Sequence, residues 1–151
     1  MELKVQGKNK YYCELLKHEL EDSNGELELF YIFITQSLNQ YLNDTNLFTN
    51  LKQIGYESLN HYETLGKVIQ MLGGIISLKD IIIEEKYKEN DINKVIETDI
   101  RKIKERIISY SKILIEIKDE YIKEIINKYI VDYRNSLNIL EMLQLKYKKN
   151  R

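Results

Sequence analysis

The stretch YESLNHYETLGKVIQMLGG, residues 56–74, decides the fold prediction because it combines a helical pattern with a helix stop. Its apolar residues recur every three or four positions, as on the buried face of a helix, at Leu65, Val68 and Leu72. Gly73 and Gly74 follow, and glycine tolerates the left-handed conformation that ends many helices. His61 continues the stripe one turn after Glu57, so the stretch also has the form of half a metal site.

Three further segments show the same periodicity. Together with the quoted stretch they predict helices over residues 25–43, 46–72, 91–117 and 119–147, after a short helical lead-in within 1–24. The chain contains no proline, which favours long uninterrupted helices. Each helix has one apolar stripe, and helices of this kind bury their stripes against one another in a bundle.

The connections predict how the helices are arranged. Residues near 44–45 and near 118–119 join neighbouring helices tightly, which favours two antiparallel hairpins. Residues 73–90 form a longer link that can cross the length of the bundle, with residues 81–83, three isoleucines, packed on its side. We therefore expect an all-α protein with one domain over residues 1–151: a four-helix bundle of two antiparallel hairpins joined by a long crossover.

Composition excludes several classes of function. The 151 residues hold 23 Lys and Arg against 24 Asp and Glu, so the net charge of −1 gives no electrostatic reason to bind nucleic acid or an anionic membrane. No apolar run approaches the roughly 18 residues that span a bilayer, which predicts no membrane insertion. The opening MELKVQGKNK lacks a signal-peptide core, and the single cysteine, Cys13, rules out an internal disulfide. We expect a cytoplasmic protein.

Two segments carry a family resemblance. YYCELLKHELEDSNGELELFYIF, residues 11–33, resembles the Tyr-Tyr lead-in and first helix of bacterial ferritin-like proteins of the rubrerythrin and manganese-catalase-like type. HYETLGKVIQMLGG, residues 61–74, resembles the His-x-Glu-x-Leu and Leu-Gly-Gly pattern of their second helix. The other two helices match in length and spacing. The resemblance implies the ferritin-like topology over nearly the whole chain.

The resemblance also implies a set of ligands for two iron or manganese ions. The family binds them with a Glu on the first helix, Glu-x-x-His on the second, a Glu on the third and Glu-x-x-His on the fourth. Carried onto this sequence, Glu26 and His61 retain their ligand types. The other four positions have lost theirs: Ser58, Ile103, Tyr133 and Ser136. Isoleucine cannot ligate a metal, so its presence at 103 removes a charge that the pair of cations requires.

Glu57 is the one substitute ligand near His61. It lies about 40° around the helix from His61, so it can in principle reach the same ion. Such a site would contain two carboxylates and one histidine, with nothing from the third and fourth helices. We expect Glu57 instead to flank the stripe and to point to the helix edge.

These observations predict that the dinuclear metal site is lost. In its place we expect a buried polar network in which Glu26 pairs with His61, and Ser58, Tyr133 and Ser136 close the hydrogen bonds. The expected function is that of a non-catalytic structural or self-assembling protein, with no catalytic residues and no cofactor. Tyr31, Ile32 and Tyr62 fall off the core stripes and are expected to cover a homo-oligomer interface. The resemblance, with the AT-rich coding bias, also implies association with spores.

Two alternatives stay open at this point. One is an active diiron or dimanganese oxidoreductase (a peroxidase, a catalase or an iron-storage subunit) with rearranged ligands such as Glu57, Glu63 or Asp99. The other is a bundle that binds a small molecule beside Ile103 and Tyr133.

Overall fold

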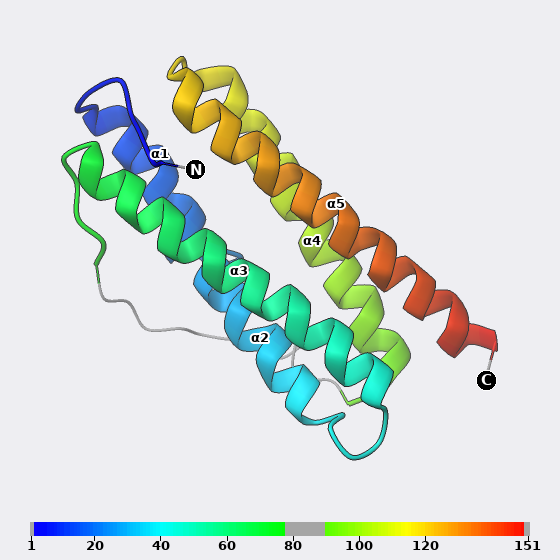
Figure 1. Ribbon diagram of the computed structural model, residues 1–151. Coiled ribbons are helices and arrows are strands. Elements are labelled where there is room, and N and C mark those ends of the chain that lie inside the picture. Colours follow the sequence, from blue (N-terminus) through cyan, green and yellow to red (C-terminus); the bar gives the residue numbers. More distant parts are fainter. Residues whose placement is uncertain (1, 78–89, 150–151) are drawn as a thin grey trace.

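The computed structural model describes residues 2–77 and 90–149, and within these ranges all regular structure is helical. The helices are α1 (Lys10–Glu21), α2 (Glu26–Leu38), α3 (Thr45–Met71), α4 (Ile92–Glu116) and α5 (Glu120–Lys149). Figure 1 shows α2 to α5 as the four rods of a bundle, with α1 continuing the line of α2 along α3. The predicted all-α fold class is confirmed.

The helix ends follow from local sequence. The side chain of Asp44 accepts a hydrogen bond from the backbone N–H of Leu47 at 3.0 Å, and Asn9 accepts one from Tyr12 at 2.9 Å, so both act as N-caps. Gly73 ends α3 with a φ of 98°, in the left-handed region that glycine adopts without strain. The glycine stop predicted after residue 72 is therefore present.

The first rod of the bundle is broken between α1 and α2. Asn24 has a φ of 75°, and a Cβ on Gly25 would lie 2.8 Å from the carbonyl oxygen of Leu20, so the chain turns here where only glycine fits. The backbone N–H of Gly25 closes this turn onto the carbonyl of Asp22 at 2.8 Å. The break places Glu26 in the first turn of α2, partway along the rod that α1 and α2 form beside α3 (Figure 1).

One predicted boundary is wrong by several residues. The helix expected over 25–43 ends at Leu38, and residues 39–44 form turns that are closed by hydrogen bonds such as Asp44 N–H to Gln40 O at 2.9 Å. Asn39, Asn43 and Asp44 explain the early end, because short polar side chains favour turns and helix caps over helix interiors.

The helices pair as predicted. α2 packs mainly on α3 and α4 mainly on α5, and α3 ends at the opposite end of the bundle from the start of α4 (Figure 1). The connection between α3 and α4 includes residues 78–89, so the predicted packing of residues 81–83 lies outside the described residues. Among the helices described, none is both long and apolar enough to span a membrane.

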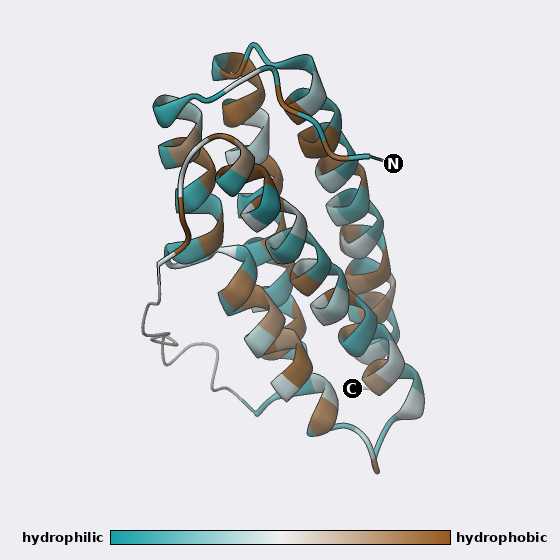
Figure 2. Ribbon diagram, turned by 60° about the vertical axis from the view of Figure 1, so that its left-hand side comes forward, coloured by the Kyte–Doolittle hydropathy of each residue, from teal (hydrophilic) through white to brown (hydrophobic). Residues whose placement is uncertain are grey.

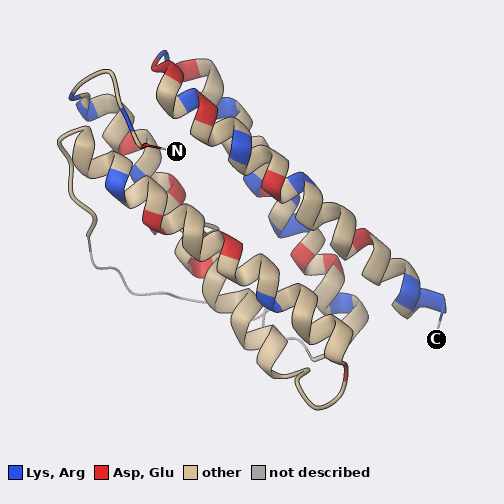
Figure 3. Cartoon of the chain, in the orientation of Figure 1, with Lys and Arg blue, Asp and Glu red and all other residues tan. Residues whose placement is uncertain are grey.

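The apolar stripes face inward and build one core. Figure 2 shows the hydrophobic faces turned between the rods, and Figure 3 shows acidic and basic residues interspersed along α3, α4 and α5. Ile32 belongs to this interior with 4% of its surface exposed, so its predicted place on a partner-facing surface is wrong. It lies three residues after the fully buried Leu29 and therefore shares its helix face. Tyr31 is half exposed, as predicted.

A buried polar centre in the bundle

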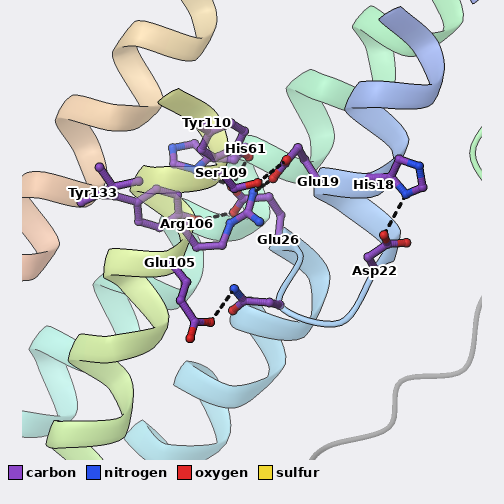
Figure 4. A network of polar contacts seen from close by, with 12 residues as sticks. His18, Glu19, Asp22, Glu26, His61, Glu105, Arg106, Ser109, Tyr110 and Tyr133 are labelled. Atoms are coloured by element: carbon purple, nitrogen blue, oxygen red, sulfur yellow. Dashed lines mark hydrogen bonds and ion pairs between the residues drawn. The ribbon is translucent and has the colours of Figure 1, made fainter. Parts of the chain in front are cut away.

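Glu26 is the focus of a polar cluster to which all four rods contribute. Its side chain is 0% exposed, and it accepts hydrogen bonds from the hydroxyl of Tyr110 at 2.5 Å and from that of Tyr133. His61 Nδ1 lies 3.3 Å from Glu26 Oε1. Figure 4 shows these side chains converging from α2, α3, α4 and α5. The predicted contacts of Glu26 with His61 and Tyr133 are thus present.

A buried arginine that the sequence analysis missed completes the centre. Arg106 of α4 is 3% exposed, forms an ion pair with Glu19 of α1, and lies with its guanidinium 4.6 Å from the centroid of the Tyr110 ring. Ser109 donates to the other oxygen of Glu19 at 2.6 Å (Figure 4). Arg106 lies three residues after Ile103 and four before Tyr110, so the core stripe itself passes through it. We call Glu19, Glu26, Arg106, Tyr110 and Tyr133 the central cluster.

The central cluster keeps its charges in the low-dielectric interior. Burial by itself raises the pKa of Glu26, but the charge and hydrogen bond of His61, with the charge of Arg106, outweigh it and lower the pKa below 4.5. Burial, reinforced by the charge of Glu26, raises the pKa values of Tyr110 and Tyr133 well above 10, so both hydroxyls stay protonated. The result is an ionised carboxylate that is surrounded by donors.

His61 links this centre to a second group of side chains. Its Nε2 lies 2.9 Å from Asp132 Oδ2, and its ring stacks on Tyr129 with 3.8 Å between centroids. Burial lowers the pKa of His61, but the charge of Glu26 and the hydrogen bond to Asp132 more than compensate and raise the pKa to about 9. The protonated ring therefore donates from Nδ1 to Glu26 and from Nε2 to Asp132.

Glu57 joins His61 and Asp132 at the edge of the bundle. Ligand atoms of these three side chains all lie within 4.8 Å of one another, and we call the three residues the edge cluster. Glu57 Oε1 is inaccessible to solvent and has no hydrogen-bond partner within residues 2–77 and 90–149. Burial, with the nearby charge of Asp132, raises the pKa of Glu57 to about 7. The expectation that the third and fourth helices add no group beside Glu57 and His61 is wrong, because Asp132 of α5 does.

The remaining predicted positions are in the core with different roles. Ser58 Oγ lies 3.1 Å from the hydroxyl of Tyr133, and Ile103 is fully buried among apolar side chains. Ser136 is buried, but the described part of the chain gives it no hydrogen bond to the central cluster, so its predicted role in closing the network is not realised. Asp132, one turn earlier on α5, contacts His61 instead.

Known structures share this fold. The structure aligns with KatB, a manganese catalase from Anabaena PCC7120, with a TM-score of 0.86 and 15% identity over 98% of this chain and 77% of that one. It aligns with a bacterioferritin of Rhodobacter capsulatus at a TM-score of 0.81 and 16% identity, over 95% and 89% of the two chains. A bacterioferritin of Desulfovibrio desulfuricans gives 0.78 and 19%, over 92% and 81%. The chain thus has the fold of the ferritin-like helical bundles.

A match in sequence adds a narrower similarity. A probable manganese catalase of Clostridium acetobutylicum is 32% identical over 74 residues, which are 49% of this chain but only 32% of that protein. The chain is therefore ferritin-like in fold and similar in part of its sequence to a manganese catalase, as the resemblance of its helices predicted. No protein-family model matches the chain.

The centre does not offer the donor set that the resemblance implies. The family pattern needs four carboxylates and two imidazoles around two cations, whereas Glu26 and His61 are joined here by two tyrosines and an arginine. Both oxygens of Glu26 accept tyrosine hydroxyls, which leaves fewer lone pairs for a metal. Arg106 has only donors and no lone pair to give.

Proposed function

We propose that this protein is a structural or self-assembling ferritin-like bundle whose centre is held by a hydrogen-bonded polar cluster instead of a dinuclear metal site. One observation carries the proposal: the buried guanidinium of Arg106 lies over Tyr110, whose hydroxyl is bonded to Glu26. In the family pattern the central carboxylates ligate metal cations. Here the guanidinium of Arg106 supplies the positive charge instead.

Electrostatics support this reading. Arg106 and protonated His61 already neutralise the two carboxylates of the central cluster, Glu19 and Glu26. Two added divalent cations would meet the permanent positive charge of Arg106 at short range in a medium of low dielectric constant, where repulsion is strong. Because desolvated charges are stable only when they are paired, the observed pairing favours the centre without metal.

Exposed apolar side chains support the self-assembling part of the proposal. Leu38, Tyr41 and Leu42 lie at the end of the α2–α3 hairpin, and Leu42 is 90% exposed. Single exposed apolar residues are ordinary, but a group of them at one end of a rod offers contact area to a second copy. A cytoplasmic location and an association with spores stay predictions.

Metal content and peroxide turnover test the proposal together. The chain would be produced with iron and manganese supplements, purified without oxygen, and examined by elemental analysis and a peroxide-decomposition assay. KatB, prepared in the same way, serves as the positive control for metal loading. We expect no dinuclear stoichiometry, no turnover above buffer, and a mass by light scattering above that of one chain. Two metals per chain together with turnover would overturn the proposal.

The second candidate is an active diiron or dimanganese oxidoreductase with rearranged ligands. The observation in its favour is that Glu57 and Asp132 lie beside His61. Of the other substitutes, Glu63 is exposed and Asp99 accepts from Gln36 at 3.1 Å. The test is the absorption spectrum of the iron-loaded protein before and after oxygen is added. A change in that spectrum, arising from the bound iron, would favour this candidate.

A further inference from the structure

The edge cluster combines three potential metal ligands from two separate helices. Glu57 and His61 lie one turn apart on α3, and Asp132 approaches them from α5, with all three ligand atoms within 4.8 Å of one another. Neither carboxylate occupies a position of the family pattern, because Glu57 and Asp132 each precede one of the altered positions, 58 and 133, by one residue. The cluster therefore shares His61 with the dinuclear set but takes both of its carboxylates from other positions.

The imidazole of His61 is held in a metal-binding orientation. Its Nδ1 is bonded to Glu26 at 3.3 Å, and its ring is fixed by stacking on Tyr129. Ligating histidines almost always donate their second ring N–H to a carboxylate or carbonyl, which sets the tautomer that ligates through the other nitrogen. With Glu26 in that position, Nε2 is the nitrogen directed at Asp132.

Glu57 supplies a donor that the protein itself leaves unused. Its Oε1 is inaccessible to solvent and has no hydrogen-bond partner among the described residues, and a buried polar atom in this state is destabilising unless an ion or a water satisfies it. Glu57 also lines a surface groove of about 440 Å³ beside Lys52 and Tyr56. Asp132 keeps 21% of its side chain exposed. The cluster is thus reachable from solvent although its imidazole is buried.

From this geometry we propose that Glu57, His61 and Asp132 bind one first-row divalent transition-metal ion, such as Zn²⁺ or Co²⁺, with solvent completing its coordination. The imidazole selects ions of this kind over Mg²⁺ and Ca²⁺, which prefer oxygen ligands alone. Binding requires His61 Nε2 to release its proton, because the metal takes the lone pair of the neutral ring.

The ion would connect the two halves of the bundle. α3 belongs to the first hairpin and α5 to the second, so a metal held by Glu57, His61 and Asp132 ties the hairpins together. Because ligand binding to the folded state alone stabilises it by mass action, the melting temperature is expected to rise with added metal.

The test is a titration of the metal-free full chain with Zn²⁺ by calorimetry and with Co²⁺ by visible absorption. We expect one ion per chain and a Co²⁺ spectrum with a nitrogen and oxygen donor set. Asp132→Asn and Glu57→Gln should each weaken binding at least about tenfold. Glu57→Gln keeps the bond between His61 and Asp132, so it reports on the site even where Asp132→Asn reduces folding.

Two matched controls guard the interpretation. Glu63→Gln changes an exposed carboxylate of α3, and His18→Asn removes the other histidine of the chain, which is exposed and paired with Asp22. Both should bind Zn²⁺ like the parent chain. The proposal is overturned if no ion binds, if Asp132→Asn and Glu57→Gln bind unchanged, or if His18→Asn abolishes binding.

This outcome can be separated from that of the proposed function. One ion per chain that is lost in Glu57→Gln supports the edge site and leaves the proposed function intact. Two ions per chain that persist in Glu57→Gln and Asp132→Asn would overturn both proposals. A chain that binds no ion would overturn only the edge site.

Discussion

The central cluster and the edge cluster are adjacent, linked by the contact of His61 in the edge cluster with Glu26 in the central cluster, but they balance charge in opposite ways. At the centre, Arg106 pairs with Glu19, and Glu26 is enclosed by donors from His61, Tyr110 and Tyr133. At the edge, two carboxylates face one imidazole, and one oxygen of Glu57 has no hydrogen-bond partner in the part of the chain that the structure describes. The comparison indicates that the central cluster stabilises the fold, whereas the edge cluster has oxygen atoms available to ligate a metal ion.

The same difference gives the two clusters opposite responses to pH. The pKa of Glu26 is lowered on folding, so its contribution is present above its ordinary value of 4.5 and is lost as the pH falls. The pKa of His61 is raised to about 9 and that of Glu57 to about 7, so their contributions are present at low pH and are lost as the pH rises through those values. Low pH therefore removes the stability that the central cluster contributes, and high pH removes the stability that the edge cluster contributes.

Removal of the buried arginine should break the centre with the largest effect. Arg106→Met leaves Glu19 buried without its ion-pair partner and removes a nearby positive charge from Glu26, and loss of one partner of a buried ion pair typically destabilises by about 3–5 kcal/mol. Urea unfolding at neutral pH measures the change. Arg101→Met is the matched control, because Arg101 is exposed on the same helix and should change stability by less than about 0.5 kcal/mol. Equal effects of the two substitutions would contradict the assigned role of Arg106.

Raising the pH should destabilise the protein through the edge cluster, by somewhat less than Arg106→Met does. The pKa of His61 rises from 6.5 to about 9, and since one pKa unit corresponds to about 1.4 kcal/mol, up to about 3 kcal/mol of stability is lost across that window. Glu57 adds to the loss in the same direction as the pH passes about 7. The measurement is the free energy of unfolding in urea against pH, with the His61 ring signals followed by NMR.

Two variants assign the pH dependence to its source. Glu57→Gln should flatten the lower part of the curve. Asp99→Asn is needed as well, because burial raises the pKa of Asp99 to about 8. Ionisation of Asp99 therefore also destabilises the folded protein as the pH rises toward 8. A ring titration of His61 at its ordinary pKa of 6.5 would contradict the ion pairs drawn to Glu26 and Asp132.

Loss of a single hydroxyl should sharpen the view of the centre. Tyr133→Phe keeps the ring but removes the donor to Glu26 and the partner of Ser58, and an unsatisfied buried acceptor is worth about 1–3 kcal/mol. Thermal and urea unfolding give the value, with Tyr121→Phe as the control at an exposed site of α5. If Tyr133→Phe left the stability unchanged, Glu26 would not depend on this hydrogen bond.

Helical periodicity predicted most of the fold, and the family resemblance placed Glu26, Ser58, His61 and Tyr133 together at the centre. The stripes located α3 to α5 to within one or two residues. They succeed because a buried stripe depends on spacing alone. They missed the end of α2 at Leu38, where polar turn residues override a pattern that continues in sequence.

Three charged residues of the two clusters, Glu19, Arg106 and Asp132, were not predicted from the sequence. Arg106 and Asp132 belong to residue types that are usually exposed, so a sequence pattern assigns them to the solvated faces of α4 and α5. Arg106 lies on the core stripe and could have been found there. Asp132 precedes the stripe residue Tyr133, and its contact with His61 depends on how α5 is rotated against α3. Glu19 reaches the centre only because α1 is aligned beside α3.

The smallest expected effect separates two serines at positions where the family resemblance implies metal ligands, a glutamate at 58 and a histidine at 136. Ser58 is bonded to the Tyr133 hydroxyl at 3.1 Å, whereas Ser136 is buried without such a bond to the central cluster within the described residues. Ser58→Ala should destabilise by about 1 kcal/mol, the net value of one hydrogen bond, while Ser136→Ala should stay within about 0.5 kcal/mol of the parent chain. Paired urea unfolding curves resolve this difference when both variants share one denaturant slope. If Ser136→Ala proved the more destabilising, the hydrogen bonds of the centre would extend along α5 past Tyr133. The central cluster would then have to include Ser136.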